Sequence, residues 1–116
     1  RARPEQETTT VRSGSNAIRF EGSGWLDLSL PVAASSTTVT VYAQYDASYT
    51  GTLPTLQVLN IPGVADQSDV QTGGSGSWEE LTATFTPTSA GIARIRLLSS
   101  DTSASGECLF DDLTVT

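Results

Sequence analysis

Short stretches in which hydrophobic and polar residues alternate follow one another along most of this 116-residue chain. The clearest is Thr37–Tyr45, where Val39, Val41 and Ala43 alternate with threonine, tyrosine and glutamine. A period of two residues is that of a β-strand with one buried face. The same alternation predicts further strands at residues 17–20, 25–30, 55–59, 80–86, 92–98 and 108–115.

Turn-forming residues separate the predicted strands, and no helical period appears. Residues 64–76 contain the run Gly-Gly-Ser-Gly and are expected to be mostly loop. Strands and turns in this order predict an all-β fold, an antiparallel β-sandwich of about eight strands, over residues 11–116. Residues 1–10 have almost no apolar side chains, so we expect a linker or N-terminal arm that is ordered only at Thr8–Thr10.

Charge removes several classes of function. Six lysines and arginines against thirteen acidic residues give a net charge of −7, and the chain has no histidine. An acidic surface argues against binding to nucleic acid or to an anionic membrane. Without histidine there is no imidazole base and no histidine-ligated metal. The single cysteine, Cys108, cannot form an internal disulfide, and no apolar run approaches the ~20 residues of a membrane-spanning helix.

The acidic residues do not predict an enzyme. Glu79 and Glu80 are adjacent at the start of a predicted strand, and adjacent strand residues face opposite sides. A glycosidase needs two carboxylates roughly 5–9.5 Å apart across a cleft. Since no pair in the sequence can be argued to meet that condition, we expect no catalytic residues.

Three stretches together resemble a known family. They read VRSGSNAIRF at residues 11–20, WEELTATF at residues 78–85 and FDDLTV at residues 110–115. In this order they are similar to the galactose-binding-like jelly roll of carbohydrate-binding modules of the family 4, 9 and 22 type. The resemblance implies a noncatalytic module that binds glycans. The same fold also serves as a structural or adhesion module in phage tails, virion decorations and surface fibres, so fold alone leaves the function open.

The resemblance also implies a structural calcium ion, and Asp111 is the candidate ligand. The family usually opens with an Asn-x-x-Phe-Glu strand, whereas residues 1–10 lack the aromatic and offer only Glu7. Alternation along the last strand places Asp111 on the face expected to be buried, where a carboxylate needs a cation or several N–H donors. The alternatives are a Ca²⁺ ligand with carbonyls near Ser13, or a carboxylate that accepts turn amides or pairs with Arg19.

Aromatic rings and arginines supply the candidate sugar contacts. Arg94 and Arg96 alternate on the outward side of one predicted strand, where they could bind sugar hydroxyls or a carboxylated glycan, or simply offset nearby acids. Tyr45 and Trp78 are expected to pack. The predicted ligand-binding residues are Tyr42 and Gln44 on a polar strand face, Trp25 at a loop–strand junction, Tyr49 in a loop, Arg94 and Arg96, with Gln57 as a further member.

Two hypotheses follow. In the first, the partner is a glycan, and the groove on a sheet face that binds it is lined by Tyr42, Gln44, Arg94 and Arg96, with Gln57 or Trp25. In the second, the domain is structural, the partners are neighbouring protein subunits, and the strand at Thr8–Thr10 is donated to one of them. The aromatic content of 7% favours the second, and the resemblance favours the first. Both place the domain outside the cell or on a virion surface.

Overall fold

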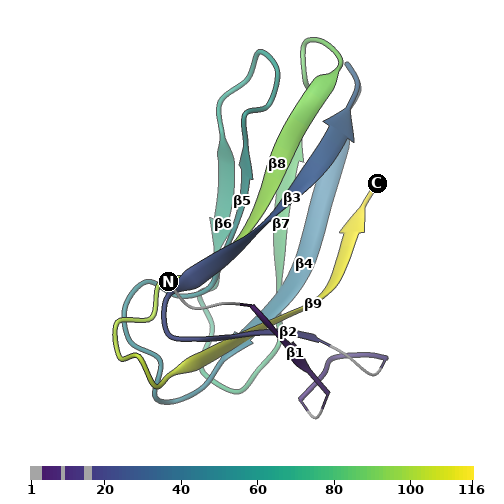
Figure 1. Cartoon of the computed structure of the whole chain (residues 1–116). Coiled ribbons are helices and arrows are strands. Elements are labelled where there is room, and N and C mark those ends of the chain that lie inside the picture. The colour runs from purple at the N-terminus through teal and green to yellow at the C-terminus, as the bar shows by residue number, and fades with distance from the viewer. Residues whose placement is uncertain (1–3, 9, 15–16) are drawn as a thin grey trace.

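Two antiparallel sheets pack face to face in the computed structural model, which describes residues 4–8, 10–14 and 17–116. One sheet has the strand order β1-β2-β9-β4-β7 and the other β3-β8-β5-β6 (Figure 1). The first comprises β1 (Glu5–Glu7), β2 (Ala17–Glu21), β9 (Glu107–Val115), β4 (Thr37–Tyr45) and β7 (Glu79–Phe85). The second comprises β3 (Gly24–Val32), β8 (Gly91–Ser99), β5 (Thr55–Leu59) and β6 (Gln67–Val70). No helix in the described ranges is long and apolar enough to cross a membrane.

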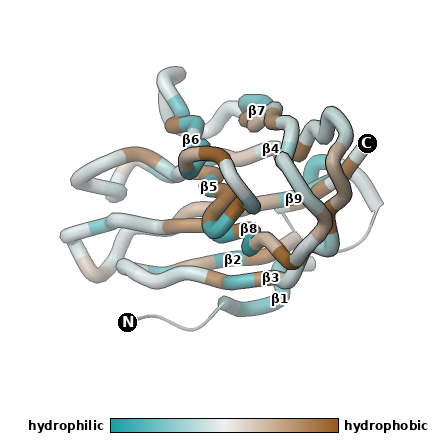
Figure 2. Tube along the Cα trace, turned by 90° about the horizontal axis from the view of Figure 1, so that it is seen from above, coloured by the Kyte–Doolittle hydropathy of each residue, from teal (hydrophilic) through white to brown (hydrophobic). Residues whose placement is uncertain are grey.

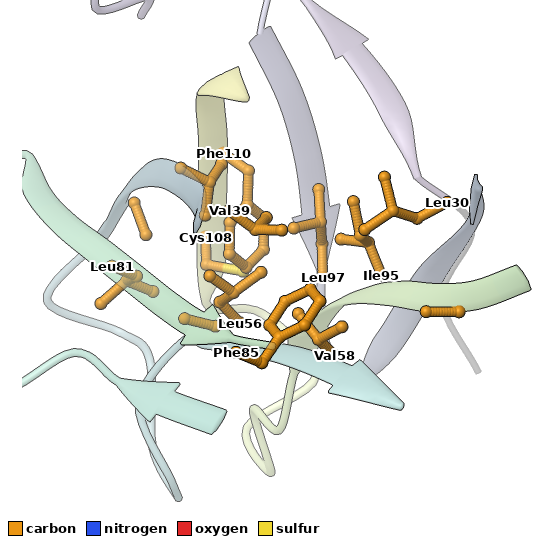
Figure 3. Close-up of a cluster of buried hydrophobic side chains, with 14 of the residues drawn as sticks. Leu30, Val39, Leu56, Val58, Leu81, Phe85, Ile95, Leu97, Cys108 and Phe110 are labelled. Atoms are coloured by element: carbon orange, nitrogen blue, oxygen red, sulfur yellow. The ribbon is translucent and has the colours of Figure 1, made fainter. Parts of the chain in front are cut away.

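The core lies between the sheets because every long strand turns its apolar positions inward. Hydrophobic and hydrophilic positions alternate along the strands (Figure 2). The side chains of Leu56, Leu97 and Phe110 are at most 1% exposed and meet in the middle of the sandwich (Figure 3). Phe20 packs edge-on against Phe110, with ring centroids 6.1 Å apart. The predicted β-sandwich is thereby confirmed.

Most strand predictions are confirmed to within two residues, and two strands fall where none was predicted. Thr37–Tyr45 and Thr55–Leu59 match their strands. Glu5–Glu7, inside the expected linker, forms β1 and pairs with β2 in the register Glu5↔Arg19. Gln67–Val70, inside the expected loop, forms β6. Both strands are short and polar, so alternation gives little signal for them. Thr9, within the run proposed for strand donation, lies outside the described residues.

The face predicted for Asp111 is wrong. Cys108 and Phe110 point into the core, so Asp111 points outward, opposite Tyr42 of β4. The pairing of β4 with β9 shifts register between Thr40 and Tyr42, and Asp112 has a φ of 55°. Over this stretch β9 has one residue more than β4, which is a β-bulge. The bulge exchanges the inward and outward positions along β9. The face predicted from the residues after the bulge is therefore wrong for the residues before Asp112, including Asp111.

Candidate functional site

The predicted sugar-binding residues lie on opposite outer faces of the sandwich. Tyr42 and Gln44 belong to β4, on the outer face of the five-stranded sheet. Trp25 of β3 and Arg94 and Arg96 of β8 lie on the outer face of the four-stranded sheet. Because the hydrophobic core separates the two faces, the prediction of one groove containing all of them is wrong.

On the five-stranded face, the ring of Tyr42 is already covered. The guanidinium carbon of Arg12 lies 3.3 Å from the ring centroid, and the hydroxyl of Tyr42 donates a hydrogen bond to Glu80 at 2.9 Å. That hydrogen bond raises the pKa of Tyr42. Gln44 is 7% exposed. Neither side chain offers a free flat surface to a sugar.

Two carboxylates of β9 hold Arg12 in place. Asp112 accepts hydrogen bonds from the guanidinium of Arg12 at 2.6 Å and from the hydroxyl of Ser13 at 2.5 Å. The bond from Ser13, and then that from Arg12, lowers the pKa of Asp112. Asp111 Oδ2 accepts the backbone N–H groups of Arg12 and Ser13 at 2.9 and 3.2 Å. We call residues 12 and 13, with the two carboxylates, the Arg12 clasp.

The surroundings of Asp111 do not fit a calcium ion. Calcium takes six to eight oxygen ligands, whereas Asp111 Oδ2 accepts two N–H groups and Oδ1 accepts the N–H of Asp112. Glu7 lies instead beside Arg19, 3.7 Å from its Nε. Within residues 4–8, 10–14 and 17–116, no group of three histidine, cysteine, aspartate or glutamate side chains is arranged so that it could hold a metal ion. Asp111 therefore matches the other interpretation, a carboxylate that accepts turn amides.

Tyr49 lies in a loop as predicted, but its predicted role as a ligand-binding residue is wrong because its side chain is buried. Its side chain is 7% exposed, and its ring lies against Tyr45 with centroids 5.6 Å apart. Its hydroxyl donates to the carbonyl of Thr52 at 2.7 Å and accepts the N–H of Ser100 at 2.8 Å. Burial raises its pKa to about 12. Tyr49 therefore anchors the loop after β8 instead of meeting a ligand.

The four-stranded face carries an ordered grid of side chains. Cross-strand pairing places them in three rows that run from β3 across β8 to β5, and the first two rows continue to β6. Neighbouring rows lie about 7 Å apart along the strands. The rows are Trp25–Leu98–Thr55–Val70, then Asp27–Arg96–Gln57–Ser68, then Ser29–Arg94–Leu59.

Asp27 orders the middle of this grid. Nε and one terminal nitrogen of Arg96 donate to its two oxygens at 2.8 and 2.9 Å, a bidentate pair. The hydrogen bonds to Asp27 raise the pKa of Arg96. The Arg96 guanidinium carbon lies 5.1 Å from the centre of the Trp25 ring. The aromatic ring, the acid and the base thus form one cluster, which sequence reasoning missed because Asp27 belongs to a different predicted strand from Arg96.

A surface cavity of about 770 Å³ opens beside Trp25. Its walls come from the turn at Gly22–Gly24 and from the loop after β8, including Asp101. Asp101 is 3% exposed and accepts the N–H groups of Thr50 and Ser103 at 2.9 and 3.0 Å. A second cavity, of about 490 Å³, lies beside β1 and β2, and none of the predicted sugar-binding residues lines it.

Comparison with known proteins places the fold. No family model and no curated protein matches the sequence. A xylan-binding domain of carbohydrate-binding module family 22 superimposes with a TM-score of 0.70 at 15% identity, covering 99% of this chain and 81% of that one. TmCBM61, solved with β-1,4-galactotriose, gives 0.68 at 19% identity, covering 99% and 87%. The chain has the fold of a carbohydrate-binding module.

The same fold occurs in a different setting. Part of the enzymatically active domain of bacteriophage CBA120 tailspike protein 4 superimposes with a TM-score of 0.68 at 8% identity. The match covers 98% of this chain and 17% of the tailspike chain. The family 22 and TmCBM61 structures confirm, for the fold, the resemblance to carbohydrate-binding modules that the sequence indicated.

Proposed function

We propose that this chain is a noncatalytic module that binds glycans on the outer face of its four-stranded sheet. The observation that carries the proposal is the cluster of Trp25 with the bidentate Asp27–Arg96 pair on an outward face. A sugar ring stacks its apolar C–H face on an indole, while its hydroxyls need donors and acceptors in fixed directions. Trp25 supplies the first of these, and Asp27, Arg96 and Gln57 supply the second.

The geometry favours this face over the opposite one. Arg96 is already oriented by Asp27, so little side-chain freedom is lost when a ligand arrives. On the five-stranded face a sugar would first have to displace Arg12 from the ring of Tyr42 and from Asp112. Arg96 also lies over the ring of Trp25, but at 5.1 Å instead of the 3.3 Å between Arg12 and Tyr42, so a ligand binds at lower cost beside Trp25.

The similar structures support the same proposal. The module TmCBM61 was solved with a galactotriose, and the family 22 domain is described as xylan-binding. In one similar structure a family 22 module is joined to the GH10 module of an endo-1,4-β-D-xylanase, and another similar structure is a phage tailspike. We infer an extracellular or virion-surface location and a supporting role beside an enzyme or adhesin.

Calorimetry with xylohexaose and β-1,4-galactotriose, followed by a wider glycan panel, tests the proposal. Trp25→Ala should weaken binding at least about tenfold, since stacking and area burial by an indole exceed about 1.4 kcal/mol. Tyr42→Ala is the matched control on the opposite face and should leave the affinity unchanged. Loss of binding in Tyr42→Ala but not in Trp25→Ala would move the site to the five-stranded sheet. Silence of the wild-type protein across plant, microbial and host glycans would remove the function.

A second candidate is a structural module of a phage tail or surface fibre, favoured by the tailspike similarity. β3 lies at the edge of its sheet and is nine residues long, so its outer backbone groups could pair with a neighbouring subunit. Light scattering at increasing concentration tests this. Assembly through β3 should give a defined oligomer, and a monomer throughout would contradict it.

A further inference from the structure

The arginines of this acidic protein differ in how closely carboxylates pair with them. Arg19 lies among four glutamates, with nitrogen–oxygen distances of 2.9 Å to Glu107 and 3.1 Å to Glu5. Arg12 is paired with Asp112 at 2.6 Å. Both belong to the side of the molecule formed by the five-stranded sheet. Their charge is already balanced by carboxylates of the same face.

The grid on the four-stranded face has the opposite balance. It carries two guanidinium groups, Arg94 and Arg96, and one carboxylate, Asp27. Both oxygens of Asp27 accept hydrogen bonds from Arg96, whereas the nearest Arg94 nitrogen is 3.8 Å away. The side chain of Arg94 is 50% exposed.

Arg94 keeps hydrogen-bonding capacity for a ligand. Its cross-strand neighbours are Ser29 and Leu59, and neither carries a charge. Among the described residues no hydrogen bond is made by its guanidinium. The grid therefore holds one excess positive charge on a protein whose net charge is −7. The rest of this acidic protein repels a negatively charged ligand, whereas the local positive charge of the grid attracts it.

We propose that this face selects glycans that carry carboxylate groups, with Arg94 binding the carboxylate of a uronic acid while a neighbouring sugar stacks on Trp25. The inference rests on the proposed function and names its ligand class. A guanidinium offers two parallel N–H donors that match the two oxygens of a carboxylate. Arg94 and Leu98, the partner of Trp25, are four residues apart on β8, or about 13 Å. An oligosaccharide, not a single sugar, spans that distance.

Glucuronoxylan and the same polymer with its carboxyl groups reduced to alcohols form a matched pair of probes. We expect the wild-type protein to bind the acidic polymer about tenfold more tightly at low salt. The difference should shrink as ionic strength rises, because screening weakens exposed charge pairs. Arg94→Gln should remove the preference while leaving the affinity for the reduced polymer unchanged. Arg12→Gln on the opposite face is the control and should behave as wild type.

The outcomes separate the two proposals. Equal affinity of the wild-type protein for both polymers would overturn the carboxylate inference and leave glycan binding intact, whereas binding to neither, nor to any other glycan, would overturn both. Arg94→Lys keeps the positive charge but loses the two parallel N–H donors, so it should retain only part of the preference. This variant also shows whether loss of binding by Arg94→Gln comes from misfolding. Strong binding of a sulfated xylan with none of glucuronoxylan would contradict recognition of a carboxylate.

Discussion

Gly106 is a position where a single added methyl group should be costly. The residue is buried in the loop between β8 and β9. A Cβ built there would lie 2.5 Å from Tyr49 Cα, 2.7 Å from Tyr49 N and 2.6 Å from Asp101 Oδ2. Two of these atoms are backbone, so the clash cannot be relieved by rotating a side chain.

The cost of Gly106→Ala follows from these contacts. Forcing a methyl group into a packed site costs about 1–3 kcal/mol. Pushing Asp101 away from its donors at Thr50 and Ser103 would add about 1–3 kcal/mol for a buried acceptor that loses a partner. We therefore expect a loss of about 3 kcal/mol in the free energy of unfolding. The carbonyl of Gly106 also accepts the N–H of Gly22, so the cavity wall beside Trp25 should shift as well.

Urea unfolding of Gly106→Ala and Gly74→Ala measures this effect. Gly74 is exposed, and a Cβ there would meet nothing within 4 Å, so its variant should stay within about 0.5 kcal/mol of wild type. With a slope of about 1.5 kcal/mol per molar urea, the midpoint of Gly106→Ala should fall by about 2 M. Equal midpoints for the two variants at an unchanged slope would refute the argument that this loop is held by close packing.

Three further outcomes follow from buried groups. Burial favours a raised pKa for Asp101, but the hydrogen bonds from Thr50 and Ser103 outweigh it, and the pKa is lower than that of an ordinary aspartate. The ionised carboxylate therefore stabilises the fold at neutral pH, and this contribution is lost as the pH falls through the pKa of the folded state. Thermal unfolding against pH should show that Asp101→Asn loses most stability near neutrality and less in acid. Burial raises the pKa of Cys108 to about 12, so a thiol reagent at pH 8 should label the unfolded protein and not the native one. Phe110→Ala should cost about 3–5 kcal/mol in urea unfolding, whereas Val115→Ala, at a side chain 44% exposed, should cost less than about 0.5.

Local alternation was enough to predict the long strands because each buries one full face. Thr37–Tyr45 carries its own signal, and no knowledge of its partners is needed. β1 and β6 form for a different reason. They are short polar strands that add to an existing edge, so their structure depends on β2 and β5 and has no periodic signature. The bulge at Asp112 is invisible for the same reason, since it appears only when β9 is paired with β4.

The sequence singled out some residues of the candidate site but did not show which of them lie together. Arg94 and Arg96 were correctly placed on outward positions, yet which strands share a sheet is a long-range property. Alternation therefore could not separate Tyr42 from Arg94. Nor could it show that Arg12, distant in sequence, covers the ring of Tyr42. Asp27 was missed because its importance comes from its partner across the strand pair, Arg96.

The two outer faces of the sandwich differ in what holds their polar groups. On the five-stranded face, Arg12 covers the ring of Tyr42 and pairs with Asp112, and Asp111 accepts backbone N–H groups. A ligand would have to break these contacts before making its own. On the four-stranded face, Asp27 orients Arg96 while Arg94 remains half exposed, so the proposed ligand would not need to break the Asp27–Arg96 pair. The loop that shapes the cavity beside Trp25 is anchored by Tyr49 and Asp101, both buried. A site whose walls are fixed by the core loses little entropy on binding, and this supports our proposal that a glycan binds on the four-stranded face.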